Sequence, residues 1–179
     1  MSEEKNATVA EVRLACRQFA MLYFHFCKVL VDALGEEGAL PLVQKAVFEL
    51  SLDRTGGARK RAEARGLAFT LENFNKVNDL PWTAWKNWDP SGGEVLCPYA
   101  QQWLGYYKEH PWFKKFASLY CDVIDTTNIE NFSRTTSHRL TKNLLWGDKE
   151  CVREYFESDT VKQGIFTYGT REASPRSEN

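Results

Sequence analysis

The feature that most constrains the fold is an apolar stripe of helical period near the start of the chain. Its members recur at steps of three and four residues: Val12, Cys16, Phe19, Tyr23, Phe26, Leu30 and Leu34. Side chains at this spacing share one face of an α-helix, and Thr8 is a suitable N-cap residue. The other faces are also largely apolar between residues 19 and 31. We therefore expect a helix over residues 8–34 at the centre of the fold.

Glycines divide the rest of the first half of the chain into shorter helices. Gly35 follows the stripe at the position where a glycine usually ends a helix. Further helical segments are predicted over residues 37–53, 58–65 and 70–77. The pair Gly56-Gly57 is expected to interrupt the helix between the first two of these segments.

Two β-hairpins are predicted in the second half of the chain. The first pairs residues 82–88 with 94–96 across the turn sequence Asp-Pro-Ser-Gly-Gly, and the second pairs 132–145 with 151–156 across Gly-Asp. Between them, Pro98 suits the first position of a helical turn, and a longer helix is expected over residues 111–128. Helices followed by hairpins favour an α+β fold, with N-terminal helices packed on a small antiparallel sheet of two hairpins.

The bulk properties exclude several classes of protein. The length of 179 residues fits one domain, which we place at residues 1–157, with a polar C-terminal extension or tail at 158–179. Lys and Arg number 23 against 24 Asp and Glu, so the basic excess of a nucleic-acid binder is missing. The polar N-terminus lacks a signal-peptide core, and no uninterrupted run of about 18 apolar residues predicts a membrane helix. We expect a cytoplasmic protein that binds neither nucleic acid nor a membrane.

The cysteines are the residues of greatest chemical interest. The chain has five of them: Cys16, Cys27, Cys97, Cys121 and Cys151. An odd number without a secretory signal indicates reduced thiols, available for packing, metal binding or catalysis. The last three could bind zinc together with a histidine, but no Cys-x-x-Cys pair supports that alternative. We expect no cofactor.

Two cysteines stand in positions that favour chemistry. Cys97 precedes Pro98 and would be the N-cap residue of a helix, where free N–H groups favour a thiolate. Cys121 and Asp125 are four residues apart, so they share a helix face that can point into a pocket. Asp125 would then act as an orienter, a base or a ligand. The alternative for both cysteines is simple packing.

Other candidates depend on where the fold places them. His25 lies within the apolar helix, either as a core residue or as a general base that meets a cysteine or aspartate. Arg61 and Arg134 could bind a substrate carboxylate, although arginines are common on surfaces. His138 lies in a predicted strand and is expected to be structural.

A set of motifs in a fixed order resembles a known family. The chain has Cys-Pro-Tyr-Ala at residues 97–100, Tyr-Cys-Asp at 120–122, and Leu-Leu-Trp-Gly-Asp at 144–148 ahead of Cys151. Over residues 20–155 this pattern is similar to the L-2-amino-thiazoline-4-carboxylic acid hydrolase family. The C-terminal part is also similar to the 4-vinyl-reductase-type ligand-binding domain. The chain departs from the family at Val152-Arg153, where the family tends to have an acidic residue and Phe.

The resemblance implies a function and a site. It implies hydrolysis of a C–N bond in a small cyclic, amidine-like acid, opening 2-aminothiazoline-4-carboxylate to N-carbamoyl-cysteine. A thiolate of Cys97 or Cys121, or an activated water, would attack; Asp125 or His25 would handle the proton. Tyr99 and Trp146 would wall a flat ring. The alternative is a non-catalytic sensor or carrier of a small molecule, and a homo-oligomer is compatible with either function.

Overall fold

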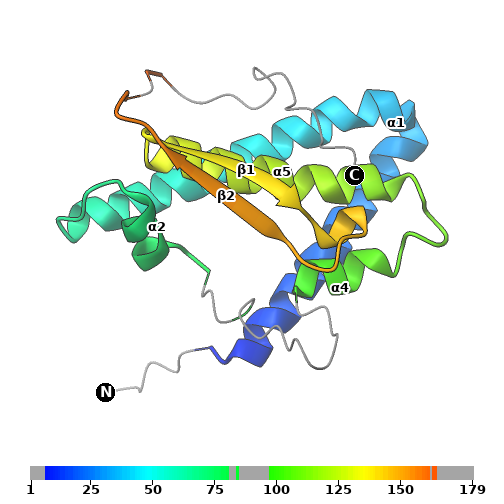
Figure 1. The fold of residues 1–179 in the computed structure, drawn as a ribbon. Helices are drawn as coiled ribbons and strands as arrows, with labels where there is room; N and C mark the ends of the chain where they lie inside the picture. Colours follow the sequence, from blue (N-terminus) through cyan, green and yellow to red (C-terminus); the bar gives the residue numbers. More distant parts are fainter. Residues whose placement is uncertain (1–6, 81–83, 85–96, 162, 165–179) are drawn as a thin grey trace.

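The computed structural model describes residues 7–80, 84, 97–161 and 163–164, and Figure 1 shows how its elements are arranged. In chain order the elements are α1 (Val9–Ala64), α2 (Leu71–Val77), α4 (Pro98–Leu104), α5 (Phe113–Phe132), β1 (Thr136–Lys142), the 3-10 helix η1 (Leu144–Trp146) and β2 (Val152–Glu157). Helices pack on a small antiparallel sheet, and the predicted α+β class is confirmed.

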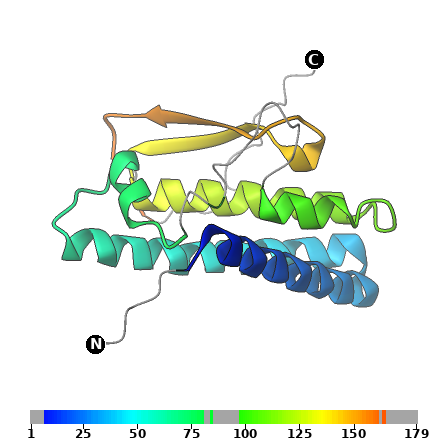
Figure 2. The same ribbon diagram turned by 90° about the horizontal axis from the view of Figure 1, so that it is seen from below.

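The molecule has three layers, and α5 forms the middle one. Figure 2 shows the sheet on one side of α5 and α1 on the other. The last seven residues of α5, from Thr126 to Phe132, are all buried. The prediction that the N-terminal helix is central is therefore wrong. Its side chains Phe26 and Val29 are 64% and 65% exposed, because no described element packs on the outer face of α1.

The helix breaks follow packing as well as local sequence. Thr8 and Glu11 form a capping box at the start of α1, and Gly35 has φ 71°, which ends the first helical segment as predicted. The predicted interruption at Gly56-Gly57 is wrong, since helix continues to Ala64. The neighbours Thr55 and Ala58 are buried. Their packing outweighs a helix penalty of about 1 kcal/mol for each glycine.

The remaining elements agree with the predicted ones in type and order. The strand predicted over residues 132–145 is too long at both ends, since Phe132 ends α5 and residues 144–146 form η1. Thr70 caps α2, α4 begins at Pro98, and the long helix α5 extends four residues beyond the predicted end. β1 and β2 form an antiparallel hairpin in which His138 pairs with Tyr155. The other predicted hairpin, over residues 82–96, lies outside the described residues except for Ala84.

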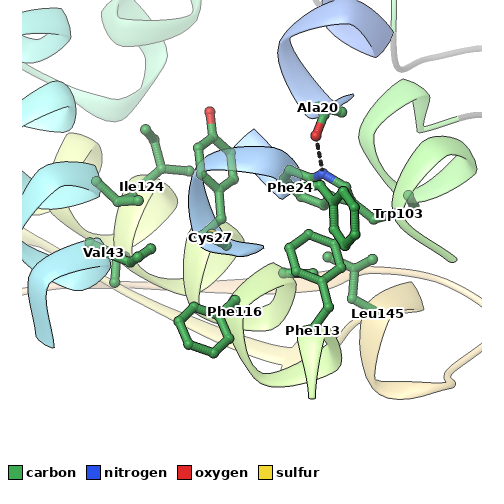
Figure 3. Packing of buried hydrophobic residues seen from close by; sticks show 14 of the residues in the cluster. Ala20, Phe24, Cys27, Val43, Trp103, Phe113, Phe116, Ile124 and Leu145 are labelled. Carbon is green, nitrogen blue, oxygen red and sulfur yellow. Dashed lines mark hydrogen bonds between the residues drawn. The ribbon is translucent and has the colours of Figure 1, made fainter. Parts of the chain in front are cut away.

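An aromatic core fixes α4 against α1 and α5. The fully buried ring of Trp103 packs edge-on against Phe113, and its Nε1 donates a hydrogen bond of 2.9 Å to the carbonyl of Ala20, drawn in Figure 3. Burial of one such side chain contributes about 1.5–3 kcal/mol. Because α4 is short and firmly anchored, the position of Cys97 at its N-terminus is well defined.

Candidate functional site

A cavity of about 150 Å³ lies where the helices meet the sheet. Its wall includes residues from α1, α2, α4, α5, both strands and the segment between the strands: Arg54, Phe74, Asn78, Leu80, Cys97, Tyr99, Ala100, Tyr120, Cys121, Ile124, Asp125, Asn128, Ile129, His138, Asn143, Leu145, Cys151, Arg153 and Tyr155. A mostly apolar wall with a few polar groups is typical of small-molecule sites. A dry cavity of about this volume in an engineered core holds one benzene ring, so one small ring fits.

Half of the residues predicted from the sequence meet in this cavity. Cys97, Tyr99, Cys121 and Asp125 all line it, although they come from two helices. The prediction that Cys121 and Asp125 share a helix face directed into a pocket is confirmed.

The other predicted residues lie elsewhere. His25 is on the exposed outer face of α1, since the apolar face that buries Phe24 and Cys27 points the other way. Arg61 donates a 2.7 Å hydrogen bond to the carbonyl of Val77 and does not line the cavity. Arg134 is in the connection between α5 and β1. Trp146 lines a separate surface depression beside Trp112 and Lys115. The structure therefore does not bring these four residues to the site.

Cys97 is the N-cap residue of α4, as predicted, but its surroundings do not favour a thiolate. Burial raises the pKa of the thiol to about 11, although the N–H groups of Ala100 and Tyr99 act in the opposite direction. Loss of hydration raises the pKa of the thiol more than the N–H groups in the first turn of this short helix lower it. At neutral pH the residue is a thiol.

Cys121 is protonated for two reasons. Burial and then the neighbouring carboxylate of Asp125 raise its pKa well above the ordinary value. The effect of Asp125 was expected, because a negative charge beside a thiol opposes its ionisation. Neither predicted nucleophile is thus activated by its surroundings in the cavity wall.

Asp125 forms an ion pair with Arg153 that leaves donors and acceptors unused. Nε and Nη2 of the arginine both bind Oδ2 of the aspartate, at 2.8 and 2.7 Å. The hydrogen bonds and ion pairs among the described residues do not involve Asp125 Oδ1 or Arg153 Nη1, and the side chains of Asp125 and Arg153 are 26% and 31% exposed. Attraction to Asp125 raises the pKa of Arg153 and outweighs burial, so the guanidinium stays charged. Arg153, one of the positions that differ from the pattern the chain resembles, thus supplies one of the two cations of the cavity wall, beside Arg54.

His138 is the most informative residue that sequence reasoning assigned only a structural role. It is 4% exposed, its Nδ1 lies 3.0 Å from Thr126 Oγ1, and its Nε2 has no partner among the described residues. Burial lowers its pKa, so the ring is neutral. One signal was available: Thr136, His138 and Leu140 alternate along β1, which puts all three on the inner face.

Asn143 contributes a second buried polar atom without a partner. Its Oδ1 accepts hydrogen bonds from Leu145 N–H at 2.9 Å and from the Cys151 thiol at 3.6 Å. This assignment leaves Nδ2 as the free end, and Nδ2 has no partner among the described residues. The side chain is 1% exposed and lines the cavity. Nothing in the sequence singled this residue out.

The motif at residues 144–151 has a clear structural purpose. Gly147 adopts φ 109° and closes a tight turn after η1, where Asp148 Oδ2 accepts the N–H of Asn143 at 2.8 Å. Cys151 accepts from the N–H of Leu144 and donates to the Asn143 side chain. The turn thereby fixes the direction of Asn143, and burial raises the pKa of Cys151. Cys151 is a positioning residue.

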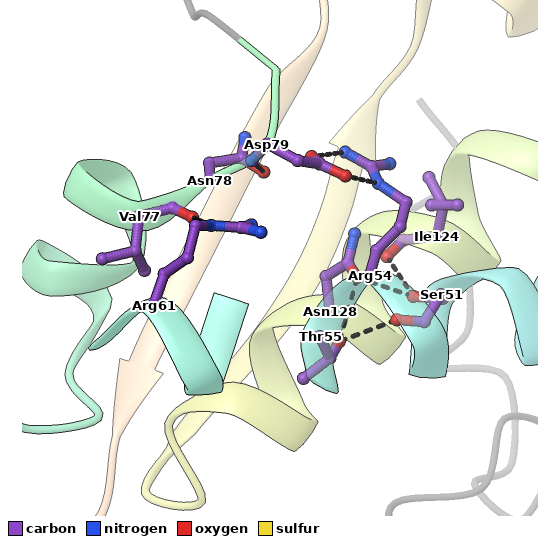
Figure 4. A network of polar contacts seen from close by, with 9 residues as sticks. All are labelled: Ser51, Arg54, Thr55, Arg61, Val77, Asn78, Asp79, Ile124 and Asn128. Atoms are coloured by element: carbon purple, nitrogen blue, oxygen red, sulfur yellow. Dashed lines mark hydrogen bonds and ion pairs between the residues drawn. The ribbon is translucent and has the colours of Figure 1, made fainter. Parts of the chain in front are cut away.

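A polar network joins α1 to α5 at the other end of the cavity (Figure 4). The buried hydroxyls of Ser51 and Thr55 donate to Asn128 Oδ1, at 2.9 and 3.0 Å. Arg54 forms a two-point ion pair with Asp79, at 2.6 and 2.9 Å. Burial acts to raise the pKa of Asp79, but the hydrogen bonds from Arg54 lower it. Each arginine of the cavity wall is therefore neutralised by one aspartate.

No metal site is found within the part of the chain that the structure describes, where no three His, Cys, Asp or Glu side chains are arranged to hold an ion. The zinc alternative gains no support from these residues. Comparisons with protein-family models, with curated proteins and with solved structures find no match to this chain. Functional inference therefore depends on the residues of the cavity.

Proposed function

We propose that this chain binds a small zwitterionic heterocyclic acid in its cavity and opens the ring by hydrolysis. The resemblance to the thiazoline-carboxylate hydrolase family suggests the reaction. The observation that best supports binding is the Asp125–Arg153 ion pair, in a cavity where His138 Nε2 and Asn143 Nδ2 lack partners among the residues that the structure describes. An unpaired buried polar group costs about 1–3 kcal/mol, which a bound polar molecule would recover.

The charges of the ion pair favour a zwitterion over a simple anion. Arg153 and Arg54 are each paired with an aspartate, so an anion alone would meet no uncompensated arginine among the described residues of the wall. A ring acid with an amidinium can offer N–H groups to Asp125 Oδ1 and a carboxylate to Arg153 Nη1. Both charges of the ligand then have partners, and no net charge enters the cavity.

Water is a better nucleophile in this site than a thiol. The pKa values of Cys97, Cys121 and Cys151 are all raised by burial. A helical threonine commonly donates its hydroxyl to the carbonyl four residues earlier, so Thr126 Oγ1 can accept from His138 Nδ1–H. The lone pair of the neutral imidazole is then on Nε2, and His138 is one of the residues that line the cavity.

The proposed reaction has two steps. The oxygen of water bonds to the ring carbon of the amidine while its proton passes to His138 Nε2. As the adduct collapses, its C–OH becomes C=O, the hydroxyl proton passes to solvent and the histidine returns its proton to the leaving atom. The bond that breaks joins that carbon to the ring sulfur in a thiazoline, because N-carbamoyl-cysteine keeps both nitrogens. The C–N cleavage that the resemblance implies therefore applies to an all-nitrogen ring. General base catalysis of this kind contributes roughly a 10²–10⁴-fold rate increase.

The test is turnover of 2-aminothiazoline-4-carboxylate and hydantoin-type ring acids, followed by mass spectrometry. His138→Gln should retain ligand affinity measured by calorimetry and lose about 10²–10⁴-fold in kcat. His25→Gln is the matched control, since His25 is exposed on α1, and should behave as wild type. Equal kcat in wild type and His138→Gln would exclude His138 as the base. An inactive wild-type protein would contradict the hydrolase proposal.

The second candidate function is a non-catalytic carrier or sensor of the same kind of ligand. Two observations favour it: the thiols are protonated, and Asp125 is paired with Arg153. Neither group is then ready to act as nucleophile or base, and His138 remains the principal proton acceptor. Native mass spectrometry that finds one ligand per chain, unchanged after long incubation, would support this function over hydrolysis.

A further inference from the structure

The outer face of the N-terminal half of α1 carries large apolar side chains that no described element covers. Leu14, Leu22, Phe26 and Val29 are 51%, 55%, 64% and 65% exposed. In Figure 2 this part of α1 forms the outermost layer, on the side of α5 away from the sheet. Contiguous exposed apolar side chains usually mark an interaction surface. None of the four residues lines the cavity.

The spacing puts these side chains on one strip of the helix. Leu22, Phe26 and Val29 follow steps of four and three, and Gln18 and His25 lie between them on the same exposed face. The strip is about 22 Å long from Leu14 to Val29, at about 1.5 Å per residue. It ends before Gly35, where the helix changes direction. A straight apolar strip of this length fits another helix.

The charges beside the strip are arranged with opposite signs at its two ends. Near the N-terminal end, Arg17 and the half-buried Arg13 outnumber the exposed Glu11, so that end is positive. Asp32 lies near the other end, and its side chain is 60% exposed although Lys28 binds it. Glu36 follows just beyond Gly35. Two copies of the helix laid parallel would put like charges together, whereas antiparallel copies put opposite charges together.

We propose that two copies of this chain pair through this strip, with their α1 helices antiparallel about a two-fold axis near His25. Such a contact is isologous: both copies use the same surface, so each pair of contacting residues occurs twice. The axis sets Leu22 of one copy beside Val29 of the other and brings Arg17 within one helical turn of Asp32. Two crossing helices bury less than a standard interface. We therefore expect a reversible dimer with a dissociation constant on the order of micromolar.

The test is the concentration dependence of the mass of the full chain, by sedimentation equilibrium. Wild type should convert from monomer to dimer as concentration rises, and Phe26→Glu should stay monomeric. Leu42→Glu is the matched control, because Leu42 is 48% exposed on α1 but lies outside the strip, and it should dimerise as wild type does. Circular dichroism checks that each variant is folded. A wild-type chain that stays monomeric at every concentration would overturn the proposal.

A charge exchange tests the antiparallel arrangement. Arg17→Glu and Asp32→Arg should each weaken the dimer about tenfold or less, and the double variant should recover most of the loss. The two residues are 15 positions apart on one helix, about 22 Å, so recovery requires contact between copies. No recovery would contradict the antiparallel register.

Lipid is the other occupant that the test must separate. By length and composition α1 also meets the criterion for a membrane-crossing helix, which core helices of soluble proteins meet as well. Flotation with phosphatidylcholine–phosphatidylserine vesicles should leave the wild-type chain unbound. Vesicle binding that is lost in Phe26→Glu would assign the strip to a lipid surface and overturn the dimer.

Discussion

The sulfur of Cys97 is subject to two opposing influences, the N–H groups of the first turn of α4 and the loss of water around it. Burial dominates and the pKa is about 11. At pH 8 about one thiol in a thousand is then ionised, because each unit below the pKa lowers the thiolate fraction tenfold. We predict slow iodoacetamide labelling of the peptide containing Cys97, with a rate that rises about tenfold per pH unit up to pH 10. Fast labelling at pH 7 would indicate an activated thiolate.

The buried imidazole of His138 predicts how stability depends on pH. Its pKa is lowered in the folded chain, so the unfolded chain binds a proton more readily as the pH falls below about 6.5. The stabilisation is complete above that value and is lost as the pH falls toward the folded pKa. Urea unfolding between pH 7.5 and 5 should show a steeper loss of stability for wild type than for His138→Gln. Parallel slopes would mean that the ring is not buried as a neutral group.

The sequence located part of the site for physical reasons. Cys97 and the pair of Cys121 and Asp125 were found because helix starts and four-residue spacing are local properties. His138 and Asn143 were not found, because their importance lies in atoms that remain unpaired after the fold forms. His25 was placed wrongly in the core, since a helix with apolar residues on several faces does not reveal which face is buried.

At the scale of single elements, substitution by alanine should have opposite effects on stability at two glycines of α1. Gly35 has φ 71°, where a side chain is strained, so Gly35→Ala should destabilise the fold by about 1–3 kcal/mol. Gly56 is inside the helix, and an added Cβ would meet no atom within 4 Å. Gly56→Ala should therefore stabilise the fold by about 0.5–1 kcal/mol. Chemical denaturation of both variants measures the difference, and equal effects would contradict the kink at Gly35.

The contrast between these glycines also explains which elements could be predicted. Gly35 ends a helix because its backbone conformation requires it, and the sequence alone indicated this position. Gly56-Gly57 looked the same in sequence, but Thr55 and Ala58 are held against other elements and the helix continues. The order of the layers depends on which apolar helix face packs against another element. That packing depends on contacts between segments far apart in the sequence.

At the scale of the whole molecule, the contact between α1 and α5 depends partly on one amide. Asn128 accepts hydrogen bonds from the buried hydroxyls of Ser51 and Thr55, each of which also has a helix carbonyl within reach. Asn128→Ala should therefore destabilise the fold by about 1–3 kcal/mol, and less if the hydroxyls turn fully to those carbonyls.

The matched control for this variant is Ser118→Ala on the same helix, where an exposed hydroxyl bonds only the carbonyl of Lys114. It should change stability by less than about 0.5 kcal/mol. Urea unfolding curves of the two variants provide the comparison. Equal stability of Asn128→Ala and Ser118→Ala would mean that the network of Figure 4 does not hold the two layers together.

The wall of the cavity takes residues from every helix named above and from both strands, so loss of any one of these elements breaks the wall. A molecule that binds the folded chain there therefore stabilises all of these elements against unfolding. A compound present at 100 times its dissociation constant would add about 2.7 kcal/mol to the free energy of unfolding. A library of metabolites can thus be ranked by the melting temperature of the protein with each compound, and the natural ligand can be found before its chemistry is known.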